Sequence, residues 1–367
     1  MKERRKISFC TVCMNRLHHL CLTLPQNILH NEDYPDCEFI LLDYNSGDDL
    51  EAWVLENMSS YIASGKLIYY KTTEPLYFHM SHSKNMAAKL GTGDIVCNVD
   101  ADNYTGKGFA SYINDVFSNG ENVLLAAEQS ANEMLIWDVF GRICVRKDDF
   151  VQIGGYDENM IHYGFEDSDF VNRLHMNGLQ RKGIPGDFLT AITHPDKDRF
   201  AQDWLFTSLS NILLHYISPA SSEVLLLLND GSYKRGTIVD NTTGCAHDYQ
   251  QSLYPTHNYE FSLLKNEWET GEWMNTGDGI QLFSSHTNTS LQYNEQQNTY
   301  LEMPANAVFY PLASDQLKHE MIFFYSQITN RIKMEGNMSQ RKIKANEGKF
   351  GGGTVYKNFN YELPITL

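Results

Sequence analysis

Three pairs of aspartates in this sequence, each with one residue between the two acids, could bind a divalent cation. They are Asp100 and Asp102, Asp167 and Asp169, and Asp196 and Asp198. The first pair differs in context, because it follows the apolar run "DIVCNV" at the point where a strand is expected to end. Two carboxylates there could hold Mn²⁺ or Mg²⁺ and leave coordination positions open for a diphosphate. A plain turn is the alternative for this segment.

A second acidic group stands in "HYGFEDSD", where Glu166, Asp167 and Asp169 open a predicted helix. Acidic residues in a first helical turn interact favourably with the helix dipole, and this is the structural alternative. Neighbouring carboxylates also disfavour each other's ionisation, which raises the pKa and suits a general base. The rings of Tyr163 and Phe165 could stack on the apolar face of a sugar. The segment is therefore a candidate for a general base beside a sugar-binding surface.

The elements that must position these residues alternate between strand and helix in the first half of the chain. Expected strands cover residues 6–14, 38–44, 66–73 and 94–100, and expected helices cover 17–30, 51–64, 81–91 and 105–120. This alternation predicts an α/β fold with a mostly parallel sheet. Ligands of such sheets gather at the carboxyl ends of the strands, where Asp43, Asp100 and Asp102 fall. His194 ends another strand-like run, and imidazole is an ordinary ligand for Mn²⁺, although a lone histidine is usually a surface residue.

The second half of the chain has a different hydrophobic pattern. Residues 199–218 carry an apolar stripe of helical period, and "SPASS" after them is a credible domain boundary. Beyond it, short alternating segments predict a smaller β-rich domain, either a sandwich or a barrel. These segments are 236–241, 259–264, 279–285, 307–312 and 320–328. The expected domains are therefore 1–218 and 219–367, with the basic stretch 331–353 as a solvated hairpin or a contact for an anionic glycan or lipid.

Composition excludes several classes of protein. The chain has 367 residues and a net charge of -17, which argues against a general nucleic-acid binder. No apolar run has the length of a membrane span, and the basic cluster at residues 2–6 fits a solvated terminus or a peripheral contact with an anionic membrane surface. Cys10 and Cys13 form a C-x-x-C inside an expected strand with no second pair, which argues against a zinc or redox site. We therefore expect a protein of the reducing cytoplasm.

Several segments, taken in order, resemble a glycosyltransferase of family 2. They are "ISFCTVCMNR", "FILLDYNSGDD", "SHSKNMAAKLGTGDIVCNVDADN" and "FGRICVRKDDFVQIGGYDENMIHYGFEDSDFVNRL". The last is particularly similar to the carboxyl-terminal region of the β-1,4-galactosyltransferases and the chondroitin-type polymerases. The resemblance covers roughly residues 5–200 and implies a GT-A fold, a UDP-sugar donor and a divalent cation, usually manganese. It also implies inverting transfer of Gal, GalNAc or a similar sugar to a glycan or glycolipid acceptor, as in surface polysaccharide synthesis.

The resemblance assigns roles to single residues. Asp43 matches the acid expected on the uracil ring, Asp167 the general base, and Glu166 its neighbour on the acceptor side. The metal ligands are expected to be Asp100 and Asp102, with Asp102 the direct one, and His194 as the third. Tyr163 and Phe165 are expected to contact the acceptor. The expected donor-binding residues are Thr11, Val12, Asn15, Arg16, Asp43, Lys84, Asn85, Asp100, Gly141 and Arg142.

This sequence departs from the family pattern at two points. Tyr44 stands where a second acid is usual, which weakens the expectation for uracil recognition. "HYGF" has one glycine fewer than the usual Trp-Gly-Gly, which leaves the donor sugar open.

Other functions remain as alternatives. A glycoside hydrolase would use paired carboxylates without a metal or a nucleotide, and a non-catalytic glycan-binding protein would rely on the β-rich tail. A dehydrogenase or a kinase is disfavoured, because the first half contains neither G-x-G-x-x-G nor G-x-x-x-x-G-K-[ST]. Binding of UDP that depends on Mn²⁺ would separate the glycosyltransferase from the hydrolase.

Overall fold

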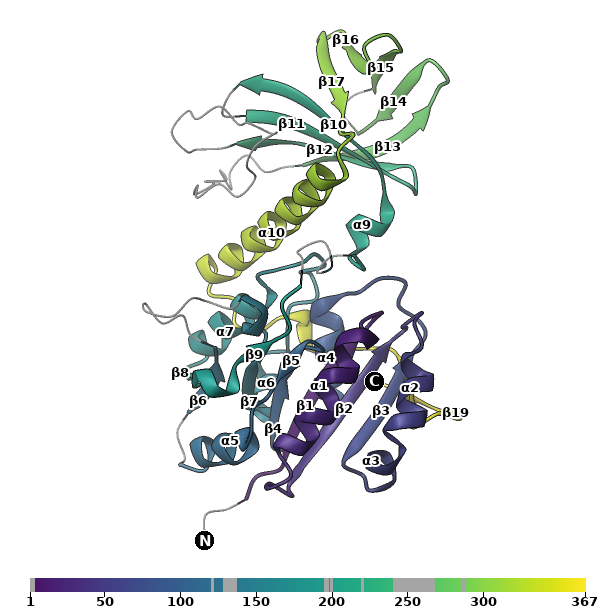
Figure 1. Ribbon diagram of the computed structural model, residues 1–367. Coiled ribbons are helices and arrows are strands. Elements are labelled where there is room, and N and C mark those ends of the chain that lie inside the picture. The colour runs from purple at the N-terminus through teal and green to yellow at the C-terminus, as the bar shows by residue number, and fades with distance from the viewer. Residues whose placement is uncertain are drawn as a thin grey trace. The chain divides into compact units, whose positions relative to one another are not determined.

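The chain folds into two compact units (Figure 1). The computed structural model describes residues 4–119, 122–127, 137–194, 198, 201–218, 221–239, 268–285 and 288–367. The first unit joins Met1–Trp204 to Thr329–Leu367, and the second is Leu205–Ile328. The expected boundary between residues 218 and 219 is therefore wrong, and so is the assignment of the whole tail to one separate domain.

The first unit is built on a nine-stranded sheet whose centre is parallel. The parallel strands are, in spatial order, β3 (Leu67–Thr72), β2 (Cys37–Tyr44), β1 (Ile7–Cys13) and β4 (Ile95–Asn98). Every residue of β1 and β2 is buried, as expected for strands covered on both faces. The sheet continues beyond β4 through β7 (Ile143–Arg146), β6 (Val123–Ala126) and β8 (Gln180–Gly183), and beyond β3 through β18 (Thr354–Lys357) and β19 (Asn360–Thr366).

Helices cover both faces of this sheet, so the predicted α/β class is confirmed. One face packs against α1 (Leu17–His30), α2 (Leu50–Asn57) and α5 (Phe109–Phe117), and the other against α4 (Met80–Leu90), α6 (Lys147–Gln152) and α7 (Glu166–Met176). A short helix, α3 (Ser59–Ala63), leads into β3. The alternation of side chains along β1 explains the two cores, because Phe9 packs on one face while Cys10 and Val12 pack on the other.

Small elements surround the end of β4. A two-stranded sheet is formed by β5 (Asn103–Tyr104) and β9 (Thr190–Ala191), and short 3-10 turns lie at Trp137–Val139 and Gly186–Phe188. They bring segments that are far apart in the sequence to one edge of the large sheet.

The second unit is a closed antiparallel barrel of eight strands. The strands are β10 (Leu209–Ser218), β11 (Ser221–Leu228), β12 (Ser232–Val239), β13 (Glu269–Asn275), β14 (Gly279–Phe283), β15 (Asn288–Asn294), β16 (Thr299–Met303) and β17 (Ala307–Pro311). Apolar side chains such as Leu225 and Phe309 fill the barrel, and Arg235 forms ion pairs with Glu223 and Glu302. The predicted β-rich second domain is thus confirmed as a barrel.

Three predictions about the second half are wrong. The helix expected over 199–218 is only α9 (Trp204–Ser208), because the following apolar residues form β10. The strand expected at 320–328 lies inside the helix α10 (Asp315–Ser339), and 331–353 forms the end of that helix and a 3-10 turn (Asn346–Gly348) rather than a hairpin. The strand expected at 259–264 lies outside the described residues. Among the described residues, no helix has both the length and the hydropathy that a membrane crossing requires.

Candidate active site

Three side chains that could bind a metal ion converge just beyond the end of β4. Asp102 belongs to the turn after β4, and Asn103, which is fully buried, follows it in β5. The pairing of β5 with β9 brings the chain before His194 alongside, and the Ile192 amide donates to the Asp102 carbonyl at 2.8 Å. The Asn103 amide donates to the Asp138 carbonyl at 2.8 Å and to the Asp102 carboxylate at 2.8 Å. Asn103 therefore holds the two acidic segments together.

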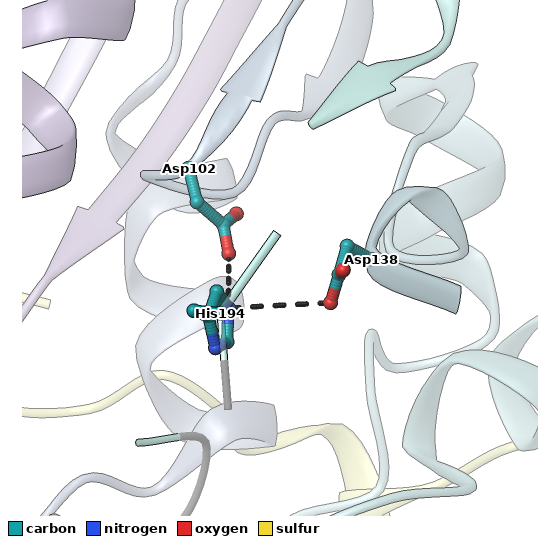
Figure 2. Close-up of side chains that lie close together, drawn as sticks. All are labelled: Asp102, Asp138 and His194. Atoms are coloured by element: carbon teal, nitrogen blue, oxygen red, sulfur yellow. Dashed lines mark hydrogen bonds and ion pairs between the residues drawn. The ribbon is translucent and has the colours of Figure 1, made fainter. Parts of the chain in front are cut away.

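These side chains, Asp102, Asp138 and His194, form a compact set of ligand atoms. Their carboxylate oxygens and ring nitrogen all lie within 4.8 Å of one another. The Nε2 atom of His194 is 2.7 Å from Oδ2 of Asp102 and 4.0 Å from Oδ1 of Asp138, and both carboxylates point toward the ring (Figure 2). Two carboxylates and one imidazole suit Mn²⁺, so the residues present fit a divalent cation.

The sequence predicted two of these three candidate ligands, Asp102 and His194, and not Asp138. Asp138 lies 36 residues beyond Asp102 in the 3-10 turn Trp137–Val139, and no pattern in the sequence connects it to the strand end. Only the fold brings it there. Burial opposes ionisation of Asp102, but hydrogen bonds from His194 and Asn103 outweigh burial, so the pKa of Asp102 lies below its usual value.

Asp100, the other acid of the first pair, is not part of this set of three. Its carboxylate accepts a hydrogen bond from Asn98 at 2.9 Å and lies against Gly141. A Cβ atom at position 141 would collide with this carboxylate, so the glycine is needed for the close approach. Burial, together with the nearby Asp167 and Asp102, raises the pKa of Asp100 to about 6, although Lys84 opposes this.

The second acidic group surrounds a buried lysine. The Nζ atom of Lys84, on α4, is 2.8 Å from Oδ1 of Asp167 and 3.0 Å from Oε1 of Glu166, both in the first turn of α7. Burial disfavours the Lys84 charge, but Asp167, Glu166 and Asp100 reverse this and raise the pKa of Lys84 well above its ordinary value. The lysine is therefore charged and holds both acids.

Asp167 has the properties that a general base needs. Burial raises its pKa to about 6, and the neighbouring Glu166 acts in the same direction, while Lys84 limits the rise. Its side chain keeps a fifth of its surface exposed, whereas that of Glu166 keeps 5%. At neutral pH the Asp167 carboxylate is thus ionised, accessible and ready to accept a proton.

Comparison with known proteins finds a family match within the first unit. Residues 124–197 match a family described as the N-terminal domain of galactosyltransferase. The match includes Asp138, the acidic pair Glu166 and Asp167, and His194. The matched stretch lies within the first unit. The resemblance to the galactosyltransferases expected from the sequence is thereby confirmed over this stretch.

Two solved structures have a partial likeness to the chain. A mannosyltransferase from Pyrobaculum calidifontis, solved with GDP-Man and Mn²⁺, is 18% identical, with a TM-score of 0.44 over 55% of this chain and 63% of that one. TarS residues 1–349 from S. aureus, solved with UDP-GlcNAc, are 16% identical, with a TM-score of 0.41 over 59% and 62%. The chain thus spans less than two thirds of the length of these structures, and likenesses of this degree say nothing about substrate. No curated protein matches the chain.

Some residues expected to bind the donor form contacts with other residues of the domain. Asp43 is fully buried at the end of β2, where its carboxylate accepts hydrogen bonds from the Ser46 amide and the Tyr69 hydroxyl and lies 3.6 Å from Lys71. Burial raises the pKa of Asp43, although these contacts oppose the rise. These contacts fix the Asp43 carboxylate at the carboxyl edge of the sheet, and its contact with a uracil ring stays a prediction.

Asn85 and Arg142 are likewise engaged inside the domain. The Asn85 amide donates to the Tyr156 carbonyl and to Glu158, both at 2.9 Å. The Arg142 guanidinium is fully buried and donates to the carbonyl of Phe188 and to Asn103. Arg142 thus supports the segment that carries Asp102, and contacts of Asn85 and Arg142 with a donor stay a prediction. Lys84, also expected near the donor, pairs with the acids of α7.

The loop after β1 stays a candidate for donor binding. Thr11 and Val12 are buried strand residues, whereas Asn15 and Arg16 are half-buried at the strand end. Asn15 adopts a left-handed backbone with φ of 57°, and its side chain accepts a hydrogen bond from the Gly47 amide at 2.6 Å. This bond ties the loops after β1 and β2 together at the carboxyl edge of the sheet, where a nucleotide is expected.

The two aromatic residues expected at the acceptor side, Tyr163 and Phe165, are half-buried in the loop before α7. Phe165 has a φ of 64°, a conformation that bulky side chains rarely adopt, and it directly precedes Glu166. Both residues lie in the loop that leads into the acidic pair, and their contact with an acceptor stays a prediction.

Proposed function

We propose that the chain is a metal-dependent, inverting glycosyltransferase that moves a sugar such as Gal or GalNAc from a UDP-sugar to a glycan or glycolipid acceptor in surface polysaccharide synthesis. The observation that carries this proposal is the set of Asp102, Asp138 and His194 at the carboxyl edge of the sheet. Asp100 connects this set to the acidic pair, because its ionisation responds both to Asp102 and to Asp167. A cation site next to a poised base is the arrangement that transfer from a nucleotide-sugar requires.

Each side chain has a defined task in this proposal. Asp102, Asp138 and His194 would hold the cation, which would supply positive charge to the departing diphosphate. Asp167 accepts the proton of the acceptor hydroxyl as that oxygen attacks the anomeric carbon from the face opposite the leaving group, so the configuration inverts. Lys84 holds the Asp167 carboxylate in place and keeps it ionised.

Release of UDP from a panel of UDP-sugars, measured with and without Mn²⁺, tests this function. We expect turnover of at least one donor, and dependence of that turnover on the cation. Asp138→Asn should weaken Mn²⁺ binding by at least about tenfold, because it removes a charged ligand from the set. Asp187→Asn, which changes an exposed acid of the same unit, is the matched control and should leave Mn²⁺ binding unchanged. The absence of UDP release from every donor would refute the proposal.

A further inference from the structure

The loop Gly154–Phe165 connects α6 to α7 and delivers Glu166 and Asp167 to the site. Its backbone is unusual at both ends, since Gly154, Gly155 and Gly164 have φ values of 75°, 65° and 91°. The last residue, Phe165, has no such freedom and still adopts a φ of 64°. A left-handed backbone at a bulky residue persists only where the surroundings enforce it. Some other part of the protein must therefore hold this loop.

Three asparagines of the C-terminal segment Thr329–Leu367 hold it; we call Asn330, Asn337 and Asn346 the asparagine clamp. The fully buried Asn330 donates both of its amide hydrogens, to the carbonyls of His162 and Gly164 (2.8 Å to the latter). The His162 carbonyl directly precedes Tyr163, and the Gly164 carbonyl directly precedes Phe165. Asn330 thus fixes the backbone that directs both aromatic residues.

The other two members of the clamp fix the beginning of the loop and the base of α7. Asn346 donates to the carbonyls of Gly154 at 2.8 Å and Tyr156 at 2.6 Å, and accepts from the Glu158 amide at 2.9 Å. Asn337 donates to Asp157 at 3.0 Å and to Asp169 of α7 at 2.9 Å. The three amides together contact the loop from its first residue to its last turn.

The domain also holds the loop from the side of the sheet. Asn85 of α4 pairs with Tyr156 in both directions, through its amide and its carbonyl oxygen. Arg173 of α7, fully buried, donates to the Gly155 carbonyl at 2.8 Å. These contacts fix the first half of the loop, and Asn330 holds the half with Tyr163 and Phe165, where His162 also lies 3.9 Å from Asp203. The clamp therefore contributes to the shape of the surface next to the acidic pair along the whole loop.

We propose that the asparagine clamp is the positioning device for acceptor recognition: it holds Tyr163, Phe165 and the first turn of α7 in the arrangement that a glycan acceptor needs. This inference rests on the proposed glycosyltransferase function. The acceptor class is a sugar that offers an apolar face to an aromatic ring and a hydroxyl to Asp167. The clamp residues touch no reacting atom, and they act through the loop.

The test separates acceptor use from donor use. Asn346→Gly removes three hydrogen bonds yet keeps a residue that accepts the φ of 59° found at this position. Asn330→Ala removes the two bonds next to Tyr163. The control is Asn358→Gly, the same change at a φ of 48° in the same segment, where the side chain accepts from the Tyr69 amide instead. Donors are UDP-Gal and UDP-GalNAc with Mn²⁺, and acceptors are p-nitrophenyl glycosides of galactose, N-acetylgalactosamine and glucuronic acid.

Both clamp variants should lower the ratio of sugar transfer to donor hydrolysis by about 10- to 100-fold, mainly through a higher KM for the acceptor, because a misplaced loop misorients the acceptor. UDP binding with Mn²⁺, measured by calorimetry, should persist, and Asn358→Gly should keep the ratio of wild type. An unchanged ratio in both clamp variants, with transfer and hydrolysis lowered equally or not at all, would overturn the inference. The clamp would then contribute to stability and not to acceptor recognition. Wild-type protein that releases no UDP from any donor would instead refute the proposed function, and the clamp proposal with it.

Discussion

At the scale of single residues, the site depends on a buried lysine, Lys84, that forms ion pairs with two acids. Lys84 contacts Glu166 and Asp167, and its removal would leave two adjacent carboxylates without a counter-charge. The sequence indicated both acids but placed Lys84 near the donor. Its partners could not be read from the chain, because 82 and 83 residues separate it from them.

This arrangement predicts the pH dependence of transfer. Burial raises the pKa of Asp167 to about 6, from an ordinary value of 3.8. A base must be ionised to accept a proton, so the rate should fall as the pH drops through about 6 and level off above it. Because Lys84 lowers this pKa, Lys84→Met should move the acidic limb of the profile to higher pH. The rate of transfer measured between about pH 5 and pH 8 checks both statements.

The profile of Lys84→Arg provides the control for this prediction. Arginine keeps the positive charge, so the acidic limb should stay near that of wild type even if the rate falls. A limb that does not move in Lys84→Met would show that Asp167 is not the group whose ionisation the profile reports.

At the scale of elements, local patterns predicted the first unit well and the second half poorly. The strands β1 to β4 and the helices α1, α4 and α5 lie where alternation and apolar period indicated them, because each is set by its own residues. β10 was mistaken for a helix, since "LSNILLHYIS" fits both periods and only pairing with β11 decides. Asp138 could not have been found at all, since a 3-10 turn brings it to Asp102 from a distant part of the chain.

The path of the C-terminal segment past α4 depends on one glycine. Gly351 has a φ of 53°, and a Cβ atom there would lie 2.8 Å from the carbonyl carbon of Asn85 and from the amide nitrogen of Met86. Both are backbone atoms that cannot rotate away. We expect Gly351→Ala to lower the free energy of unfolding by about 1–3 kcal/mol, measured by urea denaturation.

The neighbouring glycine supplies the control for this prediction. At Gly352 the nearest atom to an added Cβ is the carbonyl oxygen of Leu367 at 3.9 Å, an ordinary contact. Gly352→Ala should therefore change stability by less than about 0.5 kcal/mol. Similar losses in both variants would mean that general loss of backbone freedom, rather than the close approach of Gly351 to α4, accounts for the effect.

At the scale of the whole molecule, the first unit is discontinuous in the sequence. The second unit, Leu205–Ile328, is inserted in the sequence between its main part and its C-terminal segment. That segment adds β18 to the edge of β3 and inserts Val355, fully buried, into the core behind β2. Phe359 stacks on Tyr69 with ring centroids 4.8 Å apart. A domain boundary predicted from composition alone misses the return of the chain to the first unit, because "SPASS" marks a change of hydrophobic pattern and not the end of that unit.

The discontinuity predicts how shortened proteins behave. A chain of residues 1–218 lacks β18, β19 and the asparagine clamp, so it should expose the edge of β3 and unfold without a cooperative transition. A chain that joins residues 1–204 to 329–367 through a flexible Gly/Ser linker retains every contact within the first unit, and it should melt cooperatively and bind Mn²⁺. Near-UV circular dichroism during heating and titration with Mn²⁺ measure both properties. Cooperative melting of the 1–218 chain at the temperature of the joined chain would contradict the division, because the C-terminal segment would then contribute nothing to the fold that positions the site.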